Sequence, residues 1–195
     1  MTVPATAQER GQPDRLSPTV TPVHTIGHST RTIEAFVGLL RAGGVDMVVD
    51  IRTIPRSRTN PQFNPDALGP ALAEYQIAHS RIAALGGLRK AAVSVPPEVN
   101  GWWTNRSFHN YADYALSEAF RAGLAELETL AAERRVAIMC AEAVWWRCHR
   151  RIVADYLLAG GRAVFHLMGD AKVEPAMLTP AAVRVGEGLA YPGQA

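Results

Sequence analysis

Short apolar runs recur along the central part of the chain and have the length of buried β-strands. Four runs are continuous, and a weaker one lies between the second and the third of them. The second run contains adjacent valines, Val48 and Val49, which indicates burial on both faces of a sheet. The predicted strands cover residues 23–27, 45–51, 77–82, 136–141 and 163–167.

Between these runs, the apolar residues follow the helical period. Ile33, Phe36 and Leu40 recur at the spacing that places side chains on one face of a helix. Asn64 followed by Pro65 has the form of an N-cap and a first helical residue. The predicted helices cover residues 32–42, about 64–75, a stretch from 111, a second one capped at 117, and 148–159.

The resulting order, βαβαβααβαβ, is typical of a parallel sheet with helices on both faces. We therefore predict an α/β fold, a single three-layer domain over residues 23–167 with a mostly parallel sheet of about five strands. Residues 1–22 show neither the helical nor the strand period, so we predict a mobile tail there. Residues 168–195 predict a C-terminal extension, either a short helix or a tail. The irregular stretch 83–107 is long for a loop inside a domain, and it includes an insert from Val93 to Asn105.

Composition narrows the function classes. The net charge is +2, so a broad nucleic-acid surface is only a weak expectation. Arginines far outnumber the two lysines, which a GC-rich genome explains and which recognition of phosphate or carboxylate groups also explains. Two cysteines form no disulfide framework, the first 22 residues contain no apolar signal segment, and no apolar run reaches membrane-spanning length. We expect a cytoplasmic protein with reduced thiols and no membrane partner.

Polar side chains follow three of the predicted strands at their carboxyl ends. They are His28 and Ser29 after the first strand, Asp50 and Arg52 at the second, and Cys140 and Glu142 at the fourth. In open parallel sheets, ligands bind beyond the carboxyl ends of the strands. The sequence therefore predicts one site along this edge.

The segment 139–150, MCAEAVWWRCHR, contains both cysteines of the chain. Cys140 ends a predicted strand and lies before a predicted helix, a position that lowers the pKa of a thiol and makes it a nucleophile. The alternative is a small buried residue that only packs. Cys140 and Arg147 are spaced C-x6-R, one residue longer than the C-x5-R loop of cysteine phosphatases and rhodaneses.

Arginines near these strand ends predict an anionic ligand. Arg147, Arg150 and Arg151 lie at the start of a predicted helix, where cations oppose the helix dipole unless an anion or a carboxylate is near. Arg52 and Arg56 belong to a basic loop that suits phosphate groups. In both places the alternative is a set of solvated surface arginines. Two adjacent pairs of tryptophans are candidates for stacking a base or a sugar.

Cys148 and His149 allow several interpretations. Cys148 lies at helical spacing from Ile152, which indicates packing, and His149 fits a core histidine, a base or a ligand. Cys140, Cys148 and His149 together form a candidate metal site. Their C-x7-C-H spacing matches no zinc signature, however, and the CxxCH haem motif is absent. The cofactor therefore stays unknown from the sequence.

Five ordered motifs together resemble the domain-of-unknown-function 488 (DUF488) family. They are TIGHSTRTIEAFVGLL, VVDIRTIPRSRTNPQFN, LGG, FHNYADYA and MCAEAVWWRCHRRIVADYL, and they span roughly Val23 to Leu167. The resemblance implies a compact Rossmann-like α/β domain. The polar and glycine positions that it marks are His28, Ser29, Asp50, Arg52, Pro55, Arg56, Ser57, Asn60, Phe63, Gly86, Gly87, Tyr111, Cys140, Glu142, Arg147, Cys148, His149 and Arg150. Trp145 departs from the small residue or proline expected at its place, and the resemblance implies no reaction.

Three hypotheses follow, of which the first is an enzyme that binds a nucleotide or another phosphate-bearing compound. Its expected catalytic residues are Cys140 as nucleophile or redox thiol, Glu142 or His28 as proton carrier, and Asp50 as the group that orients a partner. Its expected ligand-binding residues are Ser29, Arg52, Arg56, Tyr111, Arg147, Cys148, His149 and Arg150. The alternatives are a non-catalytic module that binds nucleotides or nucleic acid, and a metal or haem protein that uses Cys140, Cys148 or His149.

Overall fold

The computed structural model describes residues 20–193. The helices are α1 (Ile33–Ala42), α2 (Pro65–Ala73), α3 (Arg106–Ala115), α4 (Glu118–Glu133) and α5 (Arg150–Ala159), with short 3-10 turns at Pro61–Phe63, Ala83–Leu85, Pro97–Asn100 and Trp145–Arg147. The strands are β1 (Val23–Gly27), β2 (Met47–Asp50), β3 (Ala78–Arg81), β4 (Val136–Cys140), β5 (Val164–Met168), β6 (Lys172–Pro175), β7 (Val183–Val185) and β8 (Gly188–Ala190). None of the helices within 20–193 is both long and apolar enough to cross a membrane.

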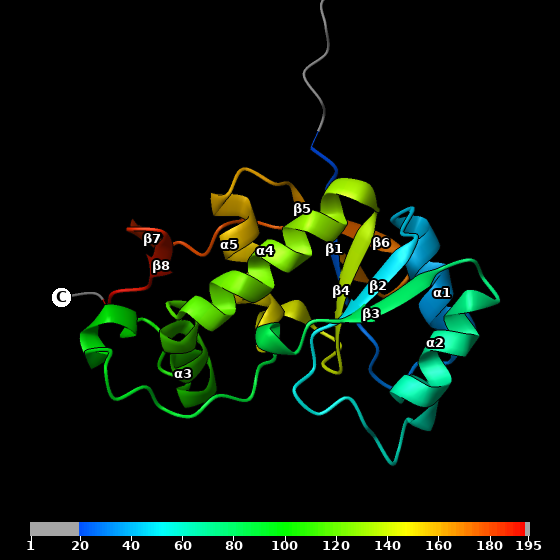
Figure 1. The fold of residues 1–195 in the computed structure, drawn as a ribbon, viewed down its shortest axis with the longest axis horizontal. Helices are drawn as coiled ribbons and strands as arrows, with labels where there is room; N and C mark the ends of the chain where they lie inside the picture. Colours follow the sequence, from blue (N-terminus) through cyan, green and yellow to red (C-terminus); the bar gives the residue numbers. More distant parts are fainter. Residues whose placement is uncertain (1–19, 194–195) are drawn as a thin grey trace, which may run out of the picture.

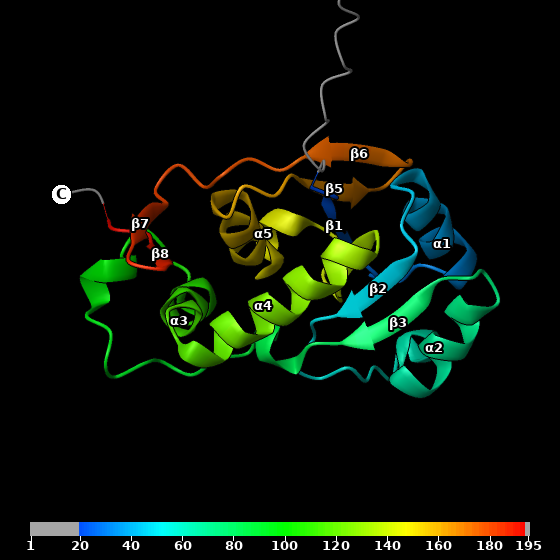
Figure 2. The same cartoon turned by 45° about the horizontal axis from the view of Figure 1, so that its top comes forward.

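A six-stranded sheet separates two layers of helices, as predicted for a three-layer α/β domain. Figures 1 and 2 show α1 and α2 on one side of the sheet and α3, α4 and α5 on the other. The adjacent valines of β2 explain the arrangement, because successive side chains of a strand point to opposite faces. Val48 packs into the cluster with α1 and α2, and Val49 packs into the cluster with α4 and α5. Both faces of the central strands are therefore buried.

The strand order β3-β2-β4-β1-β5-β6 brings the carboxyl ends of three strands together. The strands from β1 to β5 are parallel, and β4 lies between β1 and β2. Gly27 at the end of β1 is in register with Cys140, and Asp50 at the end of β2 is in register with Met139. The backbone N–H of His28 then donates to the carbonyl of Cys140 over 2.9 Å. The predicted convergence at one edge is present.

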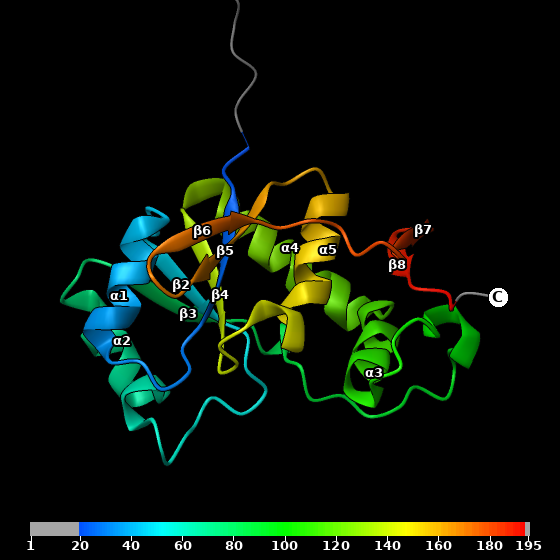
Figure 3. The same cartoon turned by 180° about the vertical axis from the view of Figure 1, so that it is seen from behind.

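The segment after β5 differs from the predicted short helix or tail. It adds β6 antiparallel to β5 and then forms the β7–β8 hairpin beside α3 and α5, as Figure 3 shows from behind. Tyr191, just after β8, is fully buried, and its hydroxyl donates to Asp155 over 3.0 Å. β6 is exposed along its whole length and is held by backbone pairing. β6 therefore has no hydrophobic pattern from which a strand could be predicted.

The helix limits agree with the predictions except around α3 and α5. Ser117 caps α4 as predicted, and Thr32 caps α1. α3 begins at Arg106, because the side chain of Asn105 accepts hydrogen bonds from the first turn. α5 begins two residues later than predicted, after the 3-10 turn Trp145–Arg147. Residues 1–19 of the predicted N-terminal tail lie outside the described residues.

Candidate functional site

Two adjoining cavities open at the carboxyl edge of the sheet. The first, of about 300 Å³, is lined by Cys140, Cys148 and His149, and we call it the thiol cavity. The second, of about 470 Å³, is lined by Arg52 and Arg56 with several hydroxyl side chains, and we call it the arginine cavity. Ile54, Ala141 and Glu142 line both cavities, so the two adjoin, and we call them together the cleft.

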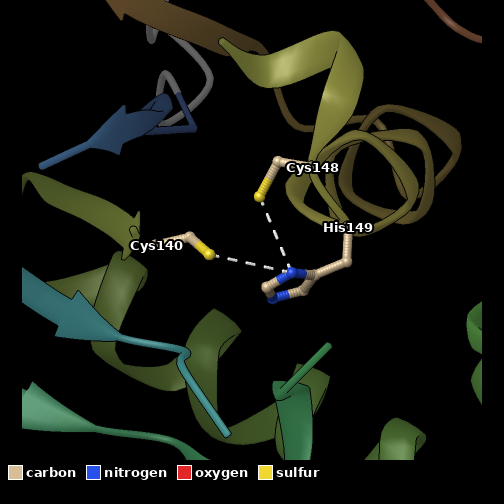
Figure 4. Close-up of side chains that lie close together, drawn as sticks. All are labelled: Cys140, Cys148 and His149. Carbon is tan, nitrogen blue, oxygen red and sulfur yellow. Dashed lines mark hydrogen bonds between the residues drawn. The ribbon is translucent and has the colours of Figure 1, made fainter. Parts of the chain in front are cut away.

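Three donor atoms converge in the thiol cavity. Cys140 ends β4, while Cys148 and His149 immediately precede α5. The Nδ1 atom of His149 lies 3.9 Å from the sulfur of Cys140 and 3.6 Å from that of Cys148, as Figure 4 shows. All three donor atoms lie within 4.8 Å of one another, and both cysteines are free thiols. The sequence suggested this cluster as one open alternative, and the structure brings it together.

The hydrogen bond on the far side of the His149 ring fixes its tautomer. The Nε2 atom lies 3.2 Å from the carbonyl oxygen of Ile51. A carbonyl can only accept, so Nε2 carries the proton in the neutral ring and Nδ1 presents its lone pair to the two sulfurs. The ring of Tyr111 packs edge-on against that imidazole, and its own hydroxyl donates to the carbonyl of Leu85 over 2.7 Å. Tyr111 is fully buried and supports His149 from behind.

Arg150 is the largest fully buried side chain of the described chain, and one of its hydrogen-bond acceptors is a sulfur atom. Its Nε donates to the sulfur of Cys148 over 3.2 Å, and its Nη2 donates to the carbonyl of Glu142 over 2.6 Å. Among the described residues, no carboxylate forms an ion pair with this guanidinium. Because a buried charge needs compensation, the Cys148 sulfur is the natural counter-ion.

The two thiols divide the ionisation between them. Burial opposes ionisation of Cys148, but a hydrogen bond from Cys140 and the charge of Arg150 outweigh it and lower the Cys148 pKa well below its usual value. Donating that hydrogen bond, together with burial, raises the pKa of Cys140 well above its usual value. The sequence favoured Cys140 as the thiol with the lowered pKa. The structure favours Cys148 instead, because the Arg150 guanidinium contacts the Cys148 sulfur.

Two glycines let the backbone approach the site closely. A Cβ atom on Gly27 would overlap the carbonyl group of Glu142, so only glycine lets the loop after β4 cross the end of β1. A Cβ atom on Gly87 would overlap the imidazole of His149. The loop that contains Gly87 thus rests directly on the ring and limits its movement. Packing of this kind holds the donor atoms in place before any ligand binds.

The arginine cavity has a different electrostatic arrangement. Arg52 and Asp50 are both buried, and the carboxylate accepts from Nε and, over 2.6 Å, from Nη2 of the guanidinium. Nη1 of Arg52 donates to Nε2 of His28 over 3.1 Å, and Nδ1 of His28 donates to the carbonyl of Ser29 over 2.8 Å. Burial, with a smaller contribution from Arg52, lowers the pKa of His28 to about 4. His28 is thus neutral near pH 7, and both of its nitrogens are engaged.

The more accessible wall of the arginine cavity carries hydroxyl, amide and guanidinium groups. Ser29 has a φ angle of 49°, a left-handed conformation that is uncommon outside glycine and often occurs at functional sites. Arg56 is exposed and makes only a long 3.5 Å contact with the exposed carboxylate of Asp66. Ser57 and Asn60 also line the cavity. Hydroxyl, amide and guanidinium donors gathered in this way suit an oxyanion.

The remaining candidates lie at the rim of the cleft or away from it. Glu142 and Arg147 are exposed and line the thiol cavity. The guanidinium of Arg151 lies 5.0 Å from the ring of Trp103, outside both cavities. Trp103 is buried against Phe108, and Trp146 is the only one of the four tryptophans that the structure leaves exposed. The aromatic stacking surface that a base-binding module would need is therefore small.

Sequence reasoning missed several groups that complete the cleft. Ser107 lines the thiol cavity, and Thr53 lines it while its hydroxyl accepts from the backbone N–H of Leu88. The carbonyl of Ile51 orients His149, and its role cannot be predicted from residue types because it is a backbone group. Thr53 and Ile51 follow β2 directly, so the rule about carboxyl ends of strands could have included them.

Comparison with known proteins identifies the family of the chain. The sequence model of the family described as "Domain of unknown function DUF488" matches residues 32–157. The chain belongs to the DUF488 family. The matched range includes Cys140, Cys148 and His149, while His28 and Ser29 precede it and lie outside. Neither a curated protein nor a solved structure matches the chain.

Proposed function

We propose that this DUF488 protein is an enzyme that binds an anionic, phosphate-bearing ligand in the cleft and reacts through the Cys140–Cys148–His149 cluster. Cys148 supplies the electron pair of the site, in place of the Cys140 favoured by the sequence. The single observation that carries the proposal is the buried Arg150 guanidinium, whose Nε lies 3.2 Å from the Cys148 sulfur and which has no carboxylate partner among the described residues. A thiolate held in this way is the reactive form of cysteine.

Charges along the cleft support an anionic ligand. Arg147 at the thiol cavity and Arg56 at the arginine cavity are exposed, while Glu142 is the one carboxylate among the residues that line these cavities. Arg89 and Lys90 line a third hollow that shares Gly87 with the thiol cavity. Low-dielectric walls with an excess of one charge attract the opposite ion. Arg52 is neutralised by Asp50 and acts as a positioning residue that shapes the cavity.

The assigned roles distribute the chemistry as follows. Cys148 is the thiolate, and Cys140 stabilises it by donating its S–H. Glu142, an exposed carboxylate on the wall that both cavities share, carries a proton to or from the ligand. His28 and Asp50 position Arg52. Free thiols with this role suit a reducing compartment, which fits a cytoplasmic protein.

Alkylation of the metal-free, reduced protein tests the proposal. Iodoacetamide labelling at pH values from about 6 to 9 is read for each cysteine by mass spectrometry, with and without inorganic phosphate or a nucleotide. We expect labelling well below the ordinary thiol pKa of about 8.5, and protection by the anion. Arg147→Ala should abolish that protection, whereas Arg121→Ala, which lines neither cavity, should retain it. Labelling that begins only near the ordinary pKa and ignores phosphate would contradict the proposal.

A further inference from the structure

The distances within the cluster are those of a metal site. The two sulfur–nitrogen distances are 3.6 and 3.9 Å. Zinc binds thiolate sulfur at about 2.3 Å and imidazole nitrogen at about 2.0–2.1 Å, so a tetrahedral site separates these atoms by about 3.5–3.6 Å. The two sulfur–nitrogen distances of the cluster therefore lie within a few tenths of an ångström of those of a zinc site, and all three donor atoms lie within 4.8 Å of one another.

The surroundings of His149 match those of a metal ligand. Its Nε2 donates to the carbonyl of Ile51 over 3.2 Å, which leaves Nδ1 as the lone-pair donor toward the sulfurs. A metal-bound histidine typically makes such a bond with its second nitrogen, and the bond fixes the ring orientation. Tyr111 and Gly87 pack on the imidazole and fix it further. The ring is therefore aligned for coordination.

Arg150 suits a metal thiolate as well as a free one. A thiolate bound to a metal retains lone pairs, and the Nε–H of Arg150 already points at the Cys148 sulfur from 3.2 Å. Two thiolates and a neutral imidazole neutralise a divalent ion. The N–H···S bond then compensates part of the charge that remains on sulfur, as outer-sphere donors commonly do.

The cavity beside the three donor atoms leaves room for a fourth ligand. The three donors all line the thiol cavity of about 300 Å³, so the side of the cluster away from the protein opens toward Glu142 and Arg147. Structural zinc sites are closed by four protein ligands, whereas catalytic sites combine three protein ligands with a water or substrate. An exposed carboxylate and a guanidinium at that opening suit a metal-bound water and an anionic substrate.

We propose that Cys140, Cys148 and His149 bind one zinc ion, with the fourth position open to the thiol cavity. The donor set of two thiolates and an imidazole favours zinc among the divalent ions, because soft sulfur ligands in tetrahedral geometry select it. This inference rests on the proposed function in taking the cluster as the reaction centre, and it names the cofactor of that centre. In the zinc-bound protein, the Cys148 sulfur donates its electron pair to the metal.

Metal analysis of the full-length protein, purified without oxygen or chelator, tests the inference. We expect stoichiometric zinc, and X-ray absorption with two sulfur neighbours at about 2.3 Å and lighter atoms at about 2.0–2.1 Å. Replacement by cobalt(II) should give a thiolate-to-metal charge-transfer band. Cys140→Ser, Cys148→Ser and His149→Gln should each weaken binding by more than the roughly 10–100-fold cost of losing an outer-sphere partner. Ser107→Ala, in the same cavity but without a donor atom of the cluster, should bind zinc like the wild type.

Several outcomes would overturn the zinc site. They are a metal-free protein that does not take up zinc or cobalt(II), a cobalt(II) spectrum without the charge-transfer band, and a haem absorption spectrum. The X-ray absorption result on the wild type remains decisive even where a ligand variant fails to fold. Failure here leaves the proposed function standing if phosphate still protects the thiols of the metal-free protein. If phosphate does not protect the thiols but X-ray absorption shows a sulfur-ligated zinc ion, the anionic ligand of the proposed function is contradicted and the zinc site is supported.

Discussion

Two buried arginines near the carboxyl edge of the sheet contact different kinds of acceptor. Arg52, with 4% of its side chain exposed, lies against the carboxylate of Asp50, which accepts several hydrogen bonds from it. Arg150, with 1% exposed, lies against the sulfur of Cys148. Both guanidiniums also donate to a backbone carbonyl, at Phe63 and at Glu142 respectively. The two arrangements therefore differ mainly in the anion.

This difference underlies our proposal that the Asp50–Arg52 pair is structural and that the Cys148–Arg150 pair is reactive. A carboxylate that accepts bonds from several N–H groups of one guanidinium has little capacity left for a ligand. The Cys148 sulfur is larger and softer than a carboxylate oxygen, accepts one hydrogen bond from Arg150, and lines a cavity. It can therefore donate to a metal or to an electrophile.

Removing the carboxylate charge of Asp50 should give the largest loss of stability. Asp50→Asn leaves the Arg52 guanidinium buried without a counter-ion, so we expect the free energy of unfolding to fall by about 3–5 kcal/mol in urea titrations. Asp66→Asn is the matched control, because Asp66 pairs with Arg56 on the surface and should cost at most about 1 kcal/mol. Equal losses in the two variants would show that the buried Asp50–Arg52 pair stabilises the fold no more than the surface pair does.

Acid should destabilise the protein through His28. Its pKa is about 4 in the folded protein, against about 6.5 in the unfolded chain, because burial and the charges of Arg52 and Arg150 outweigh the opposite effects of Asp50 and of the bond to Ser29. The unfolded chain therefore binds the extra proton between these values, and stability is lost as the pH falls from about 6.5 to about 4. The loss through His28 amounts to about 3 kcal/mol.

Unfolding measured across this pH range in the wild type and in His28→Gln checks the prediction. The variant should show a smaller slope of stability against pH, although His166, whose pKa is also about 4, keeps part of the slope in both proteins. An unchanged slope in the variant would mean that His28 takes up its proton at the same pH in the folded and unfolded states.

The two cysteines should differ in their contribution to stability. Cys148→Ser removes the anion beside Arg150 and should lower the free energy of unfolding of the metal-free protein by about 1–3 kcal/mol. Cys140→Ser keeps that anion and a hydroxyl donor, so we expect less than about 1 kcal/mol. Urea unfolding of both reduced variants makes the comparison. A reversed order would assign the charge to Cys140.

The smallest stability effect is expected at the exposed rim. Arg56→Ala should change the free energy of unfolding by no more than about 0.5 kcal/mol. It should nevertheless weaken binding of inorganic phosphate by about tenfold, since a charge-assisted contact is lost. Arg58→Ala is the control, because Arg58 is exposed in the same loop and does not line the cleft. Calorimetric titrations that give equal phosphate affinities for the two variants would contradict an anion subsite at Arg56.

The sequence was sufficient for most of the fold, because apolar periodicity reports local burial. Val48 and Val49 indicated a strand buried on both faces, and parallel connections placed Gly27, Asp50 and Cys140 at one edge. The C-terminal strands escaped prediction for a physical reason. β6 depends on backbone pairing with β5, and the burial of Tyr191 depends on Asp155, thirty-six residues away in the chain.

The roles within the site needed side-chain geometry. Spacing placed Cys140 at a strand end, which the structure confirms, and indicated packing for Cys148, which is buried but precedes α5 and lines the thiol cavity. Which sulfur carries the charge depends on the direction of the Arg150 side chain, which no spacing encodes. Arg52 was likewise expected to meet a ligand, yet Asp50 two residues before it accepts its hydrogen bonds. The roles of the two cysteines and of Arg52 therefore followed from side-chain contacts, which residue types and spacing do not specify.

Ultraviolet absorbance of the thiolate in the metal-free, reduced protein at pH 7 tests whether Arg150 holds a negative charge on Cys148. We expect the signal of one thiolate in the wild type, retained in Cys140→Ser and lost in Cys148→Ser, because the Arg150 guanidinium contacts the Cys148 sulfur. Unfolding in denaturant at the same pH should remove the signal, since an ordinary thiol is then protonated. A wild-type protein without thiolate absorbance, or one that loses it in Cys140→Ser alone, would show that Cys148 does not carry the charge.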